Sequence, residues 1–144
     1  MIDFRLARFA LVGLANTAVG LAIIFGCKAL LGMADAPANL TGYTIALLLG
    51  FTLNRRWTFG HAGNPQAAFA RYLLVLGCAY LANLATVMAA IDWLHLDSYL
   101  AQAAGIVPYT VTSYLGSRLF AFPATKRDAH IDRSRQEAQT ARSG

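Results

Sequence analysis

Four long apolar runs, separated by short polar stretches, make up most of this 144-residue chain. Each run exceeds the roughly 20 apolar residues that a helix needs to cross a bilayer. The pattern predicts an all-α membrane protein with transmembrane helices at about residues 9–31, 38–59, 67–91 and 99–122. A polar, basic segment follows at residues 123–144, so we expect a transmembrane domain over residues 1–122 and a short cytoplasmic tail.

Proline and glycine residues mark the expected connections between these helices. Residues 32–37 read as a turn, with Pro37 starting the second helix, and residues 60–66 read as a breaker-rich loop. Pro108 lies inside the fourth run. Because proline lacks an amide hydrogen, it is expected to kink that helix or to interrupt one of its hydrogen-bonded turns.

The composition supports the membrane class and argues against a nucleic-acid-binding protein. Hydrophobic residues make up 57% of the chain and charged residues only 13%, whereas soluble proteins carry roughly 25% charged residues. The net charge is +5, but the basic residues lie at the ends of the apolar runs and in the tail rather than on one soluble face. Basic residues in such places are typical of the cytoplasmic side of a membrane protein.

The distribution of basic residues also predicts the orientation. Eleven of the twelve Lys and Arg residues fall at the two termini or around the loop between the second and third runs, and only Lys28 falls on the other side, with Asp35, Asp92 and Asp97. The positive-inside rule therefore places both termini in the cytoplasm. The eleven are Arg5, Arg8, Arg55, Arg56, Arg71, Arg118, Lys126, Arg127, Arg133, Arg135 and Arg142.

An internal similarity relates the two halves of the chain at a displacement of 63 residues. The stretch Phe-Thr-Leu-Asn-Arg-Arg-Trp-Thr-Phe at 51–59 has a weaker copy, Tyr-Leu-Gly-Ser-Arg-Leu-Phe-Ala-Phe, at 114–122. Ala-Arg-Phe at 7–9 likewise corresponds to Ala-Arg-Tyr at 70–72. The sequence therefore predicts two two-helix repeats that run parallel in the membrane, as in transporters with parallel repeats.

Arginines at the inner ends of the predicted helices are the first candidates for a binding site. Arginine suits planar anions with several oxygens, and lipid phosphates are the anions at that interface. Arg55 and Arg118 occupy the same position of the two repeats, and each follows a hydrogen-bonding residue, Asn54 or Ser117. Arg8 and Arg71 open the first and third helices and could converge on the same phosphate. The alternative, which we favour for Arg56 beside Trp57, is anchoring by interfacial side chains that extend toward water.

Polar side chains inside the predicted spans form a second group of candidates. Asn16 and Thr17 lie on the first helix, and Asn83 and Thr86 lie on the third. A carboxamide in hydrocarbon requires a hydrogen-bonding partner. These residues could hold helices together, with Gly13 and Thr17 forming a small-residue face for close helix approach, or they could line a polar path through the bundle.

Several chemistries are argued against by the residues that are absent from the four runs. The runs contain no Asp, Glu or His, so the carboxylate that a proton-driven exporter of the small-multidrug type would use is missing. No catalytic triad, metal-ligand cluster or phosphate-binding glycine loop can be assembled. We therefore expect a protein that is not an enzyme and that has no metal and no cofactor. The two cysteines, Cys27 and Cys78, are expected to be free thiols.

Three stretches carry a resemblance to a known family. They are Arg-Phe-Ala-Leu-Val-Gly-Leu-Ala-Asn-Thr at 8–17, the motif at 51–59, and Phe-Ala-Arg-Tyr at 69–72. On these stretches, residues 9–122 resemble the GtrA-like family of small four-helix membrane proteins. The resemblance implies a bacterial inner-membrane protein of cell-surface polysaccharide or glycolipid synthesis. Its family-like positions are Asn16, Asn54, Arg55, Trp57 and Arg71.

Two functions follow from the resemblance. In the first, the protein translocates a polyprenyl phosphate or a polyprenyl-phosphate-linked sugar, with Arg55 and Arg118 on the phosphate and with Asn16, Asn54 and Asn83 orienting the head group. In the second, it only anchors or regulates a membrane glycosyltransferase. Four helices are few for a sugar pathway, so we expect a homodimer or a larger assembly.

Overall fold

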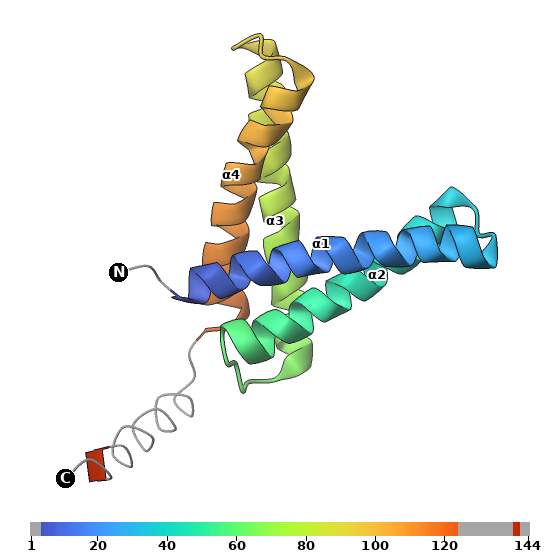
Figure 1. Cartoon of the computed structure of the whole chain (residues 1–144). Coiled ribbons are helices and arrows are strands. Elements are labelled where there is room, and N and C mark those ends of the chain that lie inside the picture. Colours follow the sequence, from blue (N-terminus) through green and yellow to red (C-terminus); the bar gives the residue numbers. More distant parts are fainter. Residues whose placement is uncertain (1–3, 124–139, 142–144) are drawn as a thin grey trace. The chain divides into compact units, whose positions relative to one another are not determined.

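The computed structural model describes residues 4–123 and 140–141, and every element in these ranges is helical. The chain divides into two units, unit 1 (Met1–Gly60) and unit 2 (His61–Gly144). Each unit contains one helical hairpin, in which two consecutive helices lie side by side (Figure 1). Most of the expected cytoplasmic tail lies outside the described residues.

The hairpin of each unit ends in an unusual turn. In unit 1, α1 (Phe4–Leu31) packs against α2 (Asp35–Leu53), which continues into the π-helical turn η1 (Asn54–Thr58). In unit 2, α3 (Pro65–Asp92) packs against α4 (Ser98–Gly116), which continues into the π-helical turn η2 (Ser117–Ala121). In both units, the first helix also contacts the π-helical turn.

Three helical stretches of the described chain are long and apolar enough to cross a membrane, namely Phe4–Leu31, Asp35–Thr58 and Pro65–Asp92. Fewer than a quarter of the residues in the most apolar window of each stretch are buried within the protein. Large apolar side chains such as Leu14 and Leu74 are mostly exposed. This distribution suits helices whose outer faces contact lipid rather than water. α4 lies outside this set because Gln102 and several hydroxyl residues interrupt its apolar surface.

Local sequence signals explain where the helices start. Asn64 caps α3, because its side chain accepts hydrogen bonds from the amides of Gln66 (2.9 Å) and Ala67 (3.4 Å), and Pro65 takes the first helical position. Asp97 caps α4 in the same way. α2 begins at Asp35, two residues before Pro37, at which the sequence predicted its start. The connection between α1 and α2 is therefore shorter than predicted. α4 continues through Pro108 without ending.

The two hairpin turns share one backbone geometry. Gly32 follows α1 with a φ of 62°, and the amide of Met33 donates to the carbonyl of Cys27 (3.2 Å). In unit 2, His95 has a φ of 51°, and the amide of Leu96 donates to the carbonyl of Ala90 (3.1 Å). In both turns, a left-handed residue precedes the residue whose amide donates to the carbonyl six positions earlier. Only unit 1 has glycine at the left-handed position.

Small residues at every fourth position bring α2 close to α1. Those on α2 are buried, and a side chain added to Gly42 would lie 2.9 Å from the backbone oxygen of Gly20. Gly13 and Thr17, which we expected to form the close-approach face of α1, are instead exposed. An added side chain at Gly13 would meet nothing within 4 Å. The buried small residues of α2 are Ala38, Gly42, Ala46 and Gly50.

Unit 2 is packed by a related stripe with different side chains. Ala101, Gly105 and Ser113 are buried on α4. A side chain added to Gly105 would lie 2.6 Å from the Nδ2 atom of Asn83, so this carboxamide occupies the space that Gly105 leaves open. Val87, Ala90 and Ala101 form a buried apolar cluster near the turn, and 63 residues earlier Ile24, Cys27 and Ala38 form one in unit 1. Both cysteines are free, as the sequence predicted.

Candidate functional site

The π-helical turns η1 and η2 contain the residues on which the sequence analysis centred. Their bounds differ by 63 residues, and each closes with a bond that spans five residues. The amide of Phe59 donates to the carbonyl of Asn54 (2.9 Å), and the amide of Phe122 donates to that of Ser117 (2.8 Å). π-Helical turns are rare and often lie at functional sites.

The spacing of the buried small residues provides a physical reason for the wide turns. An α-helix has 3.6 residues per turn, so a four-residue spacing drifts by about 40° around the axis at each step. Over the length of α2, this drift moves the stripe away from α1. A π-helix has more residues per turn than an α-helix, so the same four-residue spacing rotates in the opposite direction around the axis and reverses the drift. Asn54 and Thr58, the next positions of the four-residue series, accordingly remain buried, at 4% and 3% exposure.

Arg8 and Trp57 meet at the end of η1. The Nη1 atom of Arg8 donates to the carbonyl oxygen of Trp57 (3.4 Å). The Arg8 guanidinium carbon also lies 5.4 Å from the centre of the Trp57 ring, which is within the range of a cation–π interaction. Next to this pair, the rings of Phe9 and Phe59 are 6.2 Å apart.

Arg71 makes the corresponding contact at the end of η2. Its Nη1 atom donates to the carbonyl oxygen of Phe120 (3.3 Å), and its Nε atom donates to the carbonyl of Ala67 in its own helix (3.2 Å). The rings of Tyr72 and Phe122 lie 5.7 Å apart. Two of the expected site arginines, Arg8 and Arg71, thus each lie against the π-helical turn of their own unit.

The arginines within the turns differ in their surroundings. Arg55 is half-buried, whereas Arg56 and Arg118 are exposed. The Nη1 atom of Arg118 donates to the hydroxyl of Tyr114 (3.3 Å), and the corresponding residue of unit 1, Phe51, has no hydroxyl to accept such a bond. The sequence has no Asp or Glu between Asp35 and Asp92. Guanidinium groups suit planar anions with several oxygens.

The polar residues of the predicted spans differ in their surroundings and in their hydrogen-bond partners. The hydroxyls of Thr17 and Thr86 donate to carbonyls of their own helices, at Gly13 (3.1 Å) and Ala82 (2.8 Å), so neither of these bonds links two helices. Asn83 lies against Gly105, as described above. The Oδ1 atom of Asn16 is buried, and no hydrogen bond reaches it from the described residues.

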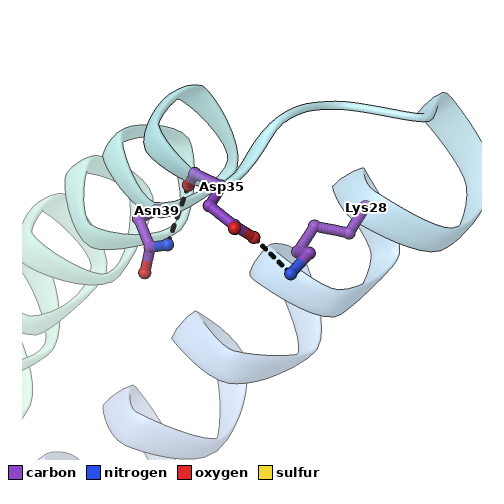
Figure 2. Close-up of polar contacts among 3 residues, drawn as sticks. All are labelled: Lys28, Asp35 and Asn39. Atoms are coloured by element: carbon purple, nitrogen blue, oxygen red, sulfur yellow. Dashed lines mark hydrogen bonds and ion pairs between the residues drawn. The ribbon is translucent and has the colours of Figure 1, made fainter.

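Lys28, the one basic residue that the sequence placed on the non-cytoplasmic side, forms an ion pair with Asp35 across the turn of unit 1 (Figure 2). The Nδ2 atom of Asn39 donates to the backbone carbonyl of Asp35 (2.8 Å), so this amide also serves the start of α2. Both partners of the ion pair remain substantially exposed, at 44% and 78%.

His61 is a residue that the sequence analysis did not select. It is 6% exposed, and its Nδ1 atom lies 3.0 Å from the carbonyl oxygen of Pro123. Its ring centre is 5.9 Å from that of Phe122. His61 therefore connects the start of unit 2 to the residues that follow η2. A histidine in a loop rich in glycine and asparagine gave no periodic signal by which it could have been found.

Comparison with known proteins assigns the chain to a family. No curated protein matches it. No group of three or more metal-ligating side chains lies within the described ranges. The family model for the GtrA/DPMS transmembrane domain, however, matches residues 8–122 and so includes both π-helical turns and the arginines that contact them. The chain therefore belongs to the GtrA/DPMS transmembrane domain family.

Proposed function

We propose that this protein moves a polyprenyl phosphate, or a polyprenyl-phosphate-linked sugar, across the bacterial inner membrane for cell-surface polysaccharide or glycolipid synthesis. The observation that carries the proposal is the pair of arginine-bearing π-helical turns, each at the end of an apolar helical hairpin. Family membership supports it, because the GtrA/DPMS family relates to polyprenyl-phosphate sugar pathways. The site itself would act by binding and release, without enzymatic chemistry, metal or cofactor.

The phosphate ligands in this proposal are Arg55 and Arg118. A guanidinium group can donate two parallel hydrogen bonds to phosphate oxygens, and such bonds are stronger where water is scarce. Asn54 and Trp57 lie on the same turn as Arg55. Asn16 and Asn83 would hydrogen-bond the polar head group, because each places a carboxamide in the apolar middle part of its helix.

We also propose a specific topology. All four helices span the membrane as two parallel two-helix repeats, and both termini and the loop at residues 59–64 are cytoplasmic. The chain assembles as a homodimer or a larger oligomer. The distribution of basic residues and the displacement of 63 residues between corresponding elements support this arrangement.

A second candidate is a non-transporting membrane anchor or regulator of a polyprenyl-phosphate glycosyltransferase. The small size of each hairpin favours it, because fewer than a quarter of the residues in the apolar windows are buried within the protein and the remaining helix surface is available to a partner. In this case the arginine-bearing turns would contact the partner enzyme rather than a lipid phosphate.

Native mass spectrometry of the full chain from gently solubilised membranes tests the proposal. The wild type is expected to retain a polyprenyl-phosphate adduct that Arg55→Ala loses, whereas added polyprenol, which lacks the phosphate, forms no adduct. Arg56→Ala is the matched control, because it removes a charge from the neighbouring position. An intact wild-type protein without this adduct, but with a co-purifying glycosyltransferase, would support the anchor instead.

A further inference from the structure

We propose that Arg8 and Arg71 are positioning residues that fasten the ends of the two π-helical turns, rather than phosphate ligands. Each lies near the start of the first helix of its unit and reaches the last part of the π-helical turn. The fastening itself does not depend on the proposed function. Its consequence for phosphate binding rests on that function.

The same contact occurs in both units. Arg8 donates to the backbone oxygen of Trp57, and Arg71 donates to that of Phe120, so donor and acceptor are 49 residues apart in each case. The acceptor is the fourth residue of the five-residue turn both times. The side chains at the acceptor positions differ, Trp57 in one unit and Phe120 in the other, but the backbone oxygen is common to both.

The carbonyl that accepts each of these bonds lies at the end of a helix, where it needs a donor. The last carbonyls of a helix have no partner within the helix, and the aligned peptide dipoles make this end partly negative. A cation that donates a hydrogen bond there is therefore stabilising. Such a bond matters more beside a bilayer, where little water is present to take its place.

Aromatic rings also pack where the first helix of each unit meets its π-helical turn. Phe9, directly after Arg8, packs near Phe59, and Tyr72, directly after Arg71, packs near Phe122. The residue that follows each arginine thus contacts the residue directly after its turn. A hydrogen bond and a ring contact at adjacent positions fix both the distance of the turn from the first helix and its rotation.

The consequence concerns Arg55 and Arg118. The fastened carbonyls belong to Trp57 and Phe120, two residues after these arginines in their turns. If the carbonyl is held, the turn cannot rotate freely, and the direction of the arginine two residues earlier is restricted. Arg8 and Arg71 would then raise phosphate affinity through Arg55 and Arg118 without contacting the phosphate.

Hydrogen exchange of the full chain in phosphatidylcholine nanodiscs, without polyprenyl phosphate, tests the fastening. Arg8→Met keeps an unbranched side chain but removes every donor. We expect amide exchange to rise by roughly two- to tenfold in peptides that cover residues 51–60, the factor for one lost hydrogen bond, and to stay unchanged at residues 114–123. Arg71→Met is expected to show the reverse pattern. Arg8→Lys, which restores a donor and a charge, is expected to recover most of the protection.

Each variant is also the charge control for the other, because Arg8→Met and Arg71→Met both remove one basic residue from the first helix of a unit. Equal exchange in wild type and Arg8→Met without the lipid, with a difference only after polyprenyl phosphate is added, would overturn the proposal and make Arg8 a phosphate ligand. Loss of exchange protection together with no polyprenyl-phosphate binding by the wild type would uphold the fastening and reject only the proposed function.

Discussion

The hydroxyl of Thr58 donates a hydrogen bond of 3.1 Å to the Oδ1 atom of Asn54, and both side chains are buried within the turn η1. In η2 the corresponding residues are Ser117 and Ala121. Ser117 is fully buried, and no hydrogen bond reaches its hydroxyl from the described residues. One turn therefore contains a satisfied polar pair, and the other contains a buried hydroxyl without this partner.

Thr58→Val and Ser117→Ala are consequently expected to have different effects on stability. Thr58→Val leaves the carboxamide oxygen of Asn54 without its donor, which costs about 1–3 kcal/mol. Ser117→Ala removes a hydroxyl that has no such bond, so the stability is expected to stay the same or to rise. Thermal unfolding of the two variants in the same detergent measures the difference. A Ser117→Ala variant as unstable as Thr58→Val would mean that the Ser117 hydroxyl has a partner after all.

The close approach of Gly42 to α1 predicts a second contrast. Gly42→Ala places a methyl group against the Gly20 backbone and the Ile24 side chain. Because a backbone oxygen cannot move aside as a side-chain end can, we expect a loss of about 1–3 kcal/mol, the usual cost of overpacking. Gly13→Ala is the control, since it adds the same methyl group to open space. Similar melting temperatures for the two variants would show that α1 and α2 do not approach each other as closely as described.

The helical nature of the chain and the position of the arginine motif could be predicted from the sequence, because long apolar runs and a repeated motif are strong local signals. The small-residue face was harder to assign. Gly13 and Thr17 have the right spacing on α1 but are exposed, whereas the series from Ala38 to Gly50 provides the contact. Spacing alone does not say which of two helix faces meets a neighbour.

The contacts of Arg8 and Arg71 lay beyond the reach of sequence reasoning for a different reason. Both arginines were selected, but for a phosphate. That each reaches a backbone carbonyl 49 residues away depends on the π-helical turns, and a five-residue bond leaves no recognisable pattern of residue types. Backbone acceptors are common to all residues, so sequence cannot reveal which one an arginine will meet.

The left-handed residue of the α3–α4 turn offers a route to higher stability. His95 has a φ of 51°, a conformation that glycine adopts without strain. A left-handed backbone conformation costs residues other than glycine roughly 1–2 kcal/mol. His95→Gly removes this strain, but the greater conformational freedom of glycine in the unfolded chain offsets part of the gain in stability. We therefore expect His95→Gly to stabilise the protein by up to about 1 kcal/mol.

The counterpart of His95→Gly is Gly32→Ala, which introduces the same strain into the α1–α2 turn and is expected to destabilise it. Gly32 has open space around its backbone, so strain in φ is the dominant effect there. Unfolding curves of both variants against wild type provide the measurement. A destabilised His95→Gly protein would indicate that the imidazole makes a favourable contact that outweighs the backbone strain.

The last prediction separates the two adjacent arginines of η1. Arg55 is half-buried and recurs as Arg118, whereas Arg56 is exposed and corresponds to Leu119. Arg55→Ala is expected to abolish function while the protein still reaches the membrane and assembles, because the group that we propose to bind the phosphate is lost. Arg56→Lys is expected to be mild, since an exposed interfacial cation needs only its charge. Both are measured by complementation of a strain that lacks the protein, with its amount in the membrane quantified. Full complementation by Arg55→Ala would contradict a phosphate role for Arg55, and a complete loss with Arg56→Lys would assign that role to Arg56.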